Sequence, residues 1–431
     1  MAPSHVATRL AVWLLLALTP TGCRKDAAPE GAGPLQSTAQ PATSITETTS
    51  APLALTDTAV WLQVPLRWRL LEIASPLPLP RDARGGVAID FAGDRLVVVG
   101  GYKFSPANTG PLHGNDIWTL PFEPELQWAE LPASDPRPTG RMGQVVIDPG
   151  RSRVILTLGR TSLIPNTKFL NDLWTYDLSS PNAFLPLRAL APRPLPVSPS
   201  HGAFVPPRNA LVFHGGVRDS KVLSDTWMLE LAEELPRWRH LSSGSAGMGS
   251  RTSGFHYYDP KRDMLIVVAG MRCYQGPCKV RGPLDAWALT GLSTPGGEEW
   301  VQLALDSELP TSAVGGRCAY DPKADRAVCQ GLWLYPDWPT SDKYVDVFET
   351  WTIASTGPRS VRMRRLDVGG SEPPINMTDV HYDPKRDRFV FFGGWKKYPK
   401  STSTTNDTWV LERRPDLASC TTAAALGEVA P

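Results

Sequence analysis

One pattern recurs six times in this chain of 431 residues, and it restricts the possible folds more than any other feature of the sequence. An aliphatic run that ends in glycine is followed, after a polar segment of variable length, by an acidic residue two positions before a tryptophan. The interval between successive tryptophans varies from 53 residues (Trp174 to Trp227) to 64 residues (Trp287 to Trp351). Self-similarity with such a period is typical of a repeat protein. The six pairs are Asp116/Trp118, Asp172/Trp174, Asp225/Trp227, Asp285/Trp287, Glu349/Trp351 and Asp407/Trp409.

Each repeat also contains short runs in which apolar and polar residues alternate. One such run follows the tryptophan, as at residues 128–131, and another precedes the next glycine run, as at residues 145–149, where Asp148-Pro149 starts a turn. Four short runs per repeat predict four strands. The 43 prolines and 36 glycines agree with short elements separated by turns rather than with long helices.

These motifs resemble the kelch repeat, and the resemblance covers residues 68 to 412. It implies an all-β, six-bladed β-propeller with one four-stranded blade per repeat. The sixth repeat ends at residue 412 without a fourth strand, whereas residues 67–72 show the fourth-strand pattern before the first blade. We therefore expect the N-terminal strand to pair with the last blade and close the ring.

The six repeated tryptophans are expected to fill the space between adjacent blades, where the burial of each large side chain contributes about 3 kcal/mol. The acidic residue two positions earlier either shares a strand face with its tryptophan or caps the preceding loop. We interpret these acids as structural, because a catalytic carboxylate has no reason to recur in every repeat.

The loops between the second and third strands are long and varied, and they predict a binding surface on one face of the propeller. Aromatic residues are frequent in these loops in blades five and six. They could stack on a sugar or on the side chains of a peptide, or they could instead pack the loops onto the scaffold. The candidate aromatic ligand-binding residues are Trp338, Tyr344, Trp395 and Tyr398.

A second group of candidates lies where the first strand of each blade should begin, near the mouth of the central channel. The polar residues expected there are Arg84, Arg141, His201, Arg251, Arg317 and Asp379. Arginine can bind a carboxylate through two parallel hydrogen bonds, so Arg84, Arg141, Arg251 and Arg317 are candidate ligand-binding residues. Alternatively, the same arginines could tie the connections between blades together.

The formal net charge of +1 gives the chain no general attraction to nucleic acid or to an anionic membrane surface. We predict a monomeric binding module whose ligand is a glycan or a protein or peptide. The alternative is an extracytoplasmic enzyme, carbohydrate-active or metal-dependent, with its site at the propeller mouth. Galactose oxidase resembles this chain only in its propeller, and the seven histidines lack the paired ligands of its copper site. No metal or cofactor is therefore expected.

The N-terminal residues resemble an export signal followed by the lipobox of bacterial lipoproteins. The apolar run at residues 10–18 is too short to span a bilayer. Thr21, Gly22 and Cys23 fit the lipobox, whereas Pro20 replaces its usual aliphatic residue. The resemblance implies an extracytoplasmic protein held at a bacterial membrane only by a lipid on Cys23. Cleavage by a general signal peptidase, which would give a periplasmic or secreted protein, stays open.

The expected organisation follows from these features. It comprises a signal peptide at residues 1–22, a disordered tether rich in Ala, Pro, Ser and Thr at 23–60, the propeller at 61–414 and a disordered tail at 415–431.

Six cysteines in an exported protein raise the possibility of disulfides. Cys318 and Cys329 flank a stretch that looks like two strands joined by a tight turn, in a register that places them opposite each other. Cys273 and Cys278 could close a small loop. Cys420 is left over, either free or paired with Cys23 if that residue carries no lipid.

Overall fold

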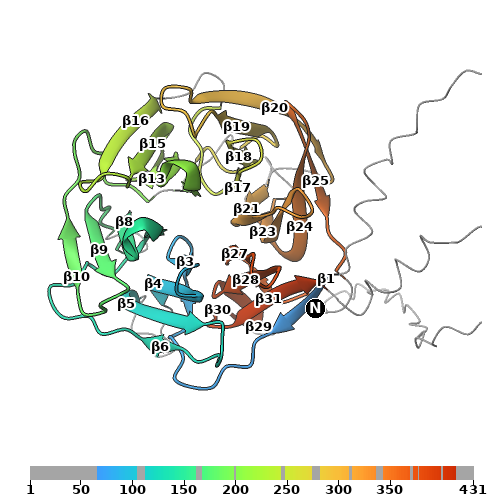
Figure 1. The fold of residues 1–431 in the computed structure, drawn as a ribbon. Helices are drawn as coiled ribbons and strands as arrows, with labels where there is room; N and C mark the ends of the chain where they lie inside the picture. The colour runs from blue at the N-terminus through green and yellow to red at the C-terminus, as the bar shows by residue number, and fades with distance from the viewer. Residues whose placement is uncertain are drawn as a thin grey trace, which may run out of the picture. The chain divides into compact units, whose positions relative to one another are not determined.

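The computed structural model describes residues 66–103, 112–161, 167–198, 200–243, 248–273, 282–309, 313–335, 343–368, 372–376, 378–398 and 401–413. Apart from two short 3-10 helices, η1 (Pro149–Arg151) and η2 (Pro206–Arg208), the regular elements in these ranges are strands. The strands form antiparallel sheets placed around a central channel (Figure 1). The all-β propeller predicted from the repeats is therefore confirmed.

Each repeat supplies one blade, whose first strand lies at the channel. The strands of the first three blades are β3 (Val87–Asp90), β4 (Arg95–Lys103), β5 (Leu112–Pro121) and β6 (Ala129–Glu130); β7 (Met142–Asp148), β8 (Arg153–Arg160), β9 (Leu173–Asp177) and β10 (Phe184–Leu187); and β11 (His201–Val205), β12 (Ala210–His214), β15 (Asp225–Glu230) and β16 (Arg237–Ser243).

The remaining three blades repeat this order. Their strands are β17 (Phe255–Asp259), β18 (Met264–Val268), β19 (Ala286–Thr290) and β20 (Glu299–Ser307); β22 (Cys318–Asp321), β23 (Arg326–Leu334), β24 (Val345–Gly357) and β25 (Ser360–Arg365); and β27 (Asp379–Asp383), β28 (Arg388–Phe392), β31 (Thr408–Arg413) and β1 (Leu66–Leu70). Blades four and five are joined further, because the end of β20 pairs in parallel with β25.

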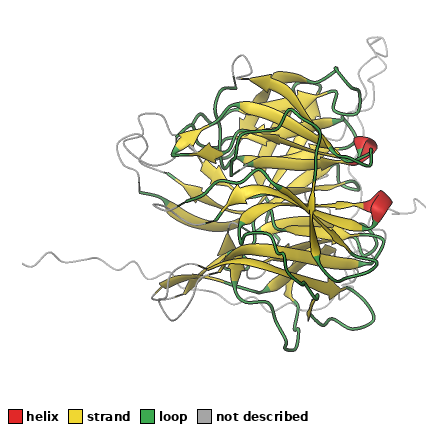
Figure 2. Ribbon diagram, turned by 90° about the vertical axis from the view of Figure 1, so that its left-hand side faces the viewer, coloured by secondary structure: helices red, strands yellow, loops and turns green. Residues whose placement is uncertain are grey.

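Short additional strands lie beside this framework at the ends that carry the long loops. β2 (Arg81–Asp82) pairs with the end of β4, and β21 (Ala313–Gly315) pairs with the end of β23. β13 (Val217–Arg218) pairs with β14 (Lys221–Val222), and β29 (Trp395–Tyr398) lies between β26 (Ile375–Asn376) and β30 (Ser401–Thr404). The two 3-10 helices follow the first strands of blades two and three, so they mark the opposite face, which has the short turns (Figure 2).

The ring closes through the N-terminal strand, as predicted. β1 pairs antiparallel with β31, with Arg67 opposite Glu412 and Leu70 opposite Trp409. The ring of Trp68 lies 4.7 Å from that of Phe391, and its indole N–H donates to the Thr350 hydroxyl of blade five at 3.2 Å. The last blade therefore takes its outer strand from the other end of the chain.

Hydrophobic side chains of each blade pack on those of the next blade. Between blades one and two, for example, Val97 and Val99 pack with Val145 and Ile147. Three of the repeated tryptophans are buried, whereas the other three are partly exposed. Glycine is required where neighbouring blades approach closely: Gly215 has φ +66°, and a Cβ there would lie 2.1 Å from the Arg251 carbonyl oxygen. The buried tryptophans are Trp118, Trp287 and Trp351.

On the short-turn face, ion pairs link successive blades. Arg262 of blade four binds Asp325 of blade five at 2.7 Å, and Lys323 of blade five binds Asp387 of blade six at 2.7 Å. Arg386 of blade six binds Asp94 of blade one at 2.6 Å. These contacts repeat in register with the Asp-Pro turns, so they belong to the framework.

One predicted disulfide is present among the described residues. Cys318 and Cys329 face each other on β22 and β23 and are bonded. Cys273 is disulfide-bonded, whereas its predicted partner Cys278 lies outside the described residues, as do Cys23 and Cys420.

Candidate binding site at the channel mouth

Two of the four predicted ligand-binding arginines are buried inside the framework. Arg141 and Arg251 are at most 1% exposed. Arg141 binds both carboxylate oxygens of Asp172, and Arg251 binds both of Asp285. Each guanidinium also donates to backbone carbonyls, so neither faces a ligand. We therefore correct the interpretation of Arg141 and Arg251: they hold the acid of the repeat in place.

The equivalent residue in blade one is Arg81, not Arg84. Arg81 is fully buried, binds Asp116 at 2.9 and 3.0 Å and donates to the Gly100 carbonyl at 2.8 Å. The Asp116 carboxylate also accepts the indole N–H of Trp118 at 2.9 Å. The structural interpretation of the repeated acid thus has a specific basis in blades one, two and four: the aspartate joins a buried arginine to the tryptophan. The matching indole contacts are Asp172–Trp174 at 2.7 Å and Asp285–Trp287 at 3.0 Å.

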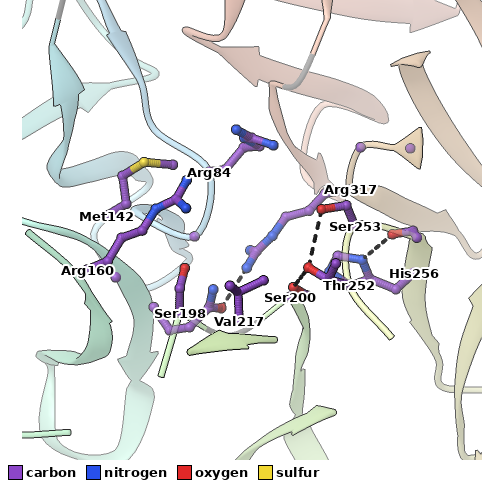
Figure 3. Close-up of a pocket in the computed structure, with 16 residues that line it drawn as sticks. Arg84, Met142, Arg160, Ser198, Ser200, Val217, Thr252, Ser253, His256 and Arg317 are labelled. Atoms are coloured by element: carbon purple, nitrogen blue, oxygen red, sulfur yellow. Dashed lines mark hydrogen bonds between the residues drawn. The ribbon is translucent and has the colours of Figure 1, made fainter. Parts of the chain in front are cut away.

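The other two predicted arginines, Arg84 and Arg317, line a polar cavity of about 90 Å³ at the channel mouth. Arg160, at the end of β8, lines it as well. Figure 3 shows Arg84 and Arg160 on one side of this cavity and Ser200, Thr252 and Ser253 on the other, with Arg317 extending between them. The cavity lies on the long-loop face, because its residues come from the starts of first strands and the ends of second strands. We call it the mouth cavity.

Arg317 bridges the channel below the mouth cavity. Its Nη2 donates to the side-chain oxygen of Gln144 in blade two at 2.6 Å, and its Nε lies 3.1 Å from the Asp379 carboxylate of blade six. Gln144, His256 and Arg317 also border a second cavity of about 280 Å³, which reaches Phe91 and Tyr258 near the short-turn face. The Arg317–Gln144 contact thus lies between two cavities of the channel, a polar one and a larger one with many apolar residues.

Burial sets the protonation of the groups around the mouth cavity. The Asp379 carboxylate is buried, and this desolvation raises its pKa to about 6, although Arg317 and the N–H groups of Gly85 and Val87 favour the charged form. Arg84 binds Asp82 at 2.6 Å and helps to lower the pKa of that carboxyl despite its burial. Burial lowers the pKa of His256 to about 3, so this imidazole is neutral near pH 7.

The aromatic candidates are only partly within the described residues. Tyr344 is 49% exposed, and its ring lies 4.8 Å from that of Trp333. Trp395 is partly buried: its ring stacks on Tyr102 at 5.8 Å, and its indole N–H donates to Asp82 at 2.9 Å. Trp395 thereby touches the same carboxylate as Arg84. Trp338 lies outside the described residues, and Tyr398 is described only as part of the β29 backbone.

Sequence reasoning missed Arg160, Gln144 and the hydroxyl side of the mouth cavity, although the repeat contains a signal for Gln144. The first strand of most blades ends in aspartate, and the residue four positions earlier is Gln144 in blade two, Arg317 in blade five and Asp379 in blade six. Arg317 contacts both of the other two residues. Arg141 and Arg251 lie seven and eight residues before their aspartates, Asp148 and Asp259, so they do not belong to this position.

Within the described ranges, no three His, Cys, Asp or Glu side chains are placed to hold a metal ion. No helix in the same part of the chain is long and apolar enough to cross a membrane.

Comparison with known proteins supports the same class of fold. No family model matches the chain. The chain is 25% identical over 329 residues to the F-box/kelch-repeat protein At1g51550 of Arabidopsis thaliana, which covers 74% of this chain and 64% of that protein. It is 27% identical over 314 residues to adagio-like protein 2 of Oryza sativa subsp. japonica, which covers 68% of this chain and 46% of that protein. The chain thus spans less than two thirds of either relative.

A solved structure agrees with these relatives. The structure of YjhT superposes with a TM-score of 0.53 at 13% identity, over 77% of this chain and 95% of YjhT. At this identity the similarity concerns the fold alone. Together, the strand pairing, the kelch-repeat relatives and the YjhT structure support a kelch-like β-propeller fold for this chain.

Proposed function

We propose that this propeller is an interaction module that binds a protein or peptide on its long-loop face. The observation that carries the proposal is the mouth cavity, where polar side chains of several blades converge at the centre of that face. The kelch-repeat relatives support a protein ligand rather than a glycan, because kelch-type propellers generally serve protein interaction.

The surroundings of the mouth cavity suit a protein ligand. Rigid strands hold its lining, so little conformational entropy is lost there on binding. The exposed ring of Tyr344, supported by Trp333, offers contact area in blade five, and Trp395 lies beside Asp82 and Arg84 in blades six and one. We therefore expect the ligand to contact Tyr344 at the periphery and to insert a side chain into the mouth cavity.

A peptide array with the purified full chain tests this proposal. Tyr344→Ala should weaken the bound peptides about tenfold, because it removes an exposed aromatic contact. Phe91→Ala is the matched control: Phe91 is 66% exposed but lies on the short-turn face. An array with no bound peptide, combined with binding to a glycan array, would transfer the proposal to a glycan ligand. Equal effects of the two substitutions would place the binding surface elsewhere.

We also propose that the module works outside the cytoplasm, attached to a bacterial membrane by lipid on Cys23. The proposal rests on the lipobox-like residues 19–23, which lie outside the described residues. Cys23→Ser should move the protein from the membrane to the soluble fraction. An unchanged membrane fraction would refute lipidation, and a wild-type protein that is already soluble would favour a periplasmic or secreted one.

A further inference from the structure

We infer that the mouth cavity is a receptor for a single acidic side chain, aspartate or glutamate, of the protein partner. This inference rests on the proposed interaction function and specifies the chemistry that the site recognises. It also replaces the arginine set expected from the sequence: Arg84, Arg160 and Arg317 would hold the carboxylate, whereas Arg141 and Arg251 are structural.

The charged side chains at the mouth cavity favour an anionic group. Three arginine side chains line the mouth cavity, and none of its described lining residues is acidic. Arg84 is bound to Asp82 and Arg317 to Asp379, and both of these carboxylates lie outside the lining of the cavity. In a partly enclosed site, guanidinium groups attract an anion more strongly than they would in bulk water.

The hydrogen-bonding groups of the mouth cavity also suit a carboxylate. Opposite Arg84 and Arg160, the hydroxyls of Ser200, Thr252 and Ser253 line the wall, and those of Ser200 and Thr252 are hydrogen-bonded to each other. Hydroxyl groups can donate to a carboxylate at the same time as a guanidinium does. His256 also lines the site, but its low pKa makes it neutral there. The positive charge therefore comes from arginine alone.

The size of the mouth cavity suits a single side chain. A water-sized group needs roughly 10–15 Å³ of such space, so a cavity of about 90 Å³ holds roughly six to nine of them. This matches the five heavy atoms of a glutamate side chain together with a few waters. The Arg317–Gln144 bridge forms the floor and limits the depth to which a group can enter. A long or bulky ligand would have to remain above the mouth with only one group inserted.

The experiment uses the full chain and an array of peptides made in pairs, each glutamate or aspartate peptide with its glutamine or asparagine partner. We expect carboxylate members to bind at least tenfold more tightly than their amide partners. Arg160→Met and Arg317→Met should each remove most of this preference, since methionine keeps the volume but not the charge. Arg362→Met is the control, because Arg362 lies on the outer strand β25 and binds Asp306 of β20, away from the mouth cavity.

The outcomes separate the inference from the proposed function. Binding without any carboxylate preference, or a preference that survives both arginine substitutions in folded protein, overturns the acidic receptor and leaves the interaction module intact. An array without bound peptides counts against both. If Arg317→Met fails to fold because it loses its contacts to Gln144 and Asp379, then Arg160→Met decides the question alone.

Discussion

Replacing Arg251 tests whether the buried arginines are part of the framework. Arg251 is completely buried, and its guanidinium binds the Asp285 carboxylate with two nitrogens while donating to the Ala269 carbonyl at 2.9 Å. Arg251→Met keeps much of the side-chain volume but leaves the largely buried Asp285 without its cation. Breaking one partner of a buried ion pair costs about 3–5 kcal/mol of the free energy of unfolding.

The expected loss should appear as a lower melting temperature. At about 2 °C per kcal/mol for a large domain, the midpoint should fall by roughly 6–10 °C. The assay is thermal and urea unfolding followed by circular dichroism, with Asp285→Asn and the double variant included. If the two residues act as a pair, the double variant should be destabilised by clearly less than the sum of the single variants.

A matched control separates burial from charge. Arg218 forms an exposed ion pair with Asp219, so Arg218→Met should leave the melting temperature nearly unchanged. A melting temperature of Arg251→Met equal to that of the wild type would refute the structural assignment. Weaker ligand binding by a variant of wild-type stability would restore Arg251 as a ligand-binding residue.

Three further predictions concern ring closure, acid stability and the pH dependence of binding. Trp68→Ala should lower the free energy of unfolding by about 3–5 kcal/mol, because it removes the packing of β1 on Phe391. Arg67 forms an exposed pair with Glu412, so Arg67→Ala should leave this free energy nearly unchanged. Urea unfolding of the two variants tests this difference. In the folded state, burial lowers the pKa of four histidines below 6.5: His201, His214, His256 and His381. The unfolded state therefore binds more protons below pH 6.5, and the free energy of unfolding should fall as the pH drops towards 4. The fall should be up to about 1.4 kcal/mol per pH unit for each histidine. The pKa of Asp379 is raised to about 6, so its protonation has the opposite effect on stability and offsets the effect of about one of the four histidines. A urea midpoint that stays constant from pH 7 to 4.5 would contradict the expected loss of stability. Protonation of Asp379 below pH 6 also removes a carboxylate from Arg317, so an acidic peptide should bind more tightly at pH 5.5 than at pH 7.5, and Asp379→Asn should abolish the difference in titration calorimetry.

The framework could be predicted from the sequence because its signals are local and repeated. The pairing of residues 67–70 with β31 followed from counting strands, and the Cys318–Cys329 pair followed from a hairpin register. Both depend on alternation along short strands, which a single sequence records directly.

The candidate site was only half predictable, because it depends on how far each arginine lies from the start of its strand. The extra residues before β3, β7 and β17 place Arg81, Arg141 and Arg251 against the repeated aspartates, whereas Arg84 and Arg317 reach the mouth cavity. A difference of a few residues in the position of an arginine before its strand decides whether the side chain is buried against an aspartate or reaches the channel. Neither the composition nor the spacing of the repeats predicts this difference. Arg160 comes from the end of a second strand, so its place beside Arg84 and Arg317 depends on how the blades are arranged around the channel.

The contrast between repeated and unrepeated residues supports the proposed position of the binding site. The Arg–Asp–Trp contact recurs in blades one, two and four, and a contact needed by several blades is explained by the stability that it gives to each of them. Four positions before the end of the first strand, by contrast, the residues are Gly86, Gln144, His201, Phe255, Arg317 and Asp379, which differ in size, polarity and charge. Phe255 is buried in a hydrophobic core, so packing explains this residue. Gln144, Arg317 and Asp379 are polar residues at the channel, and packing alone does not require them there. Among these positions, Gln144, Arg317 and Asp379 are joined in one network directly beneath the mouth cavity, which is where we expect ligand specificity to be set.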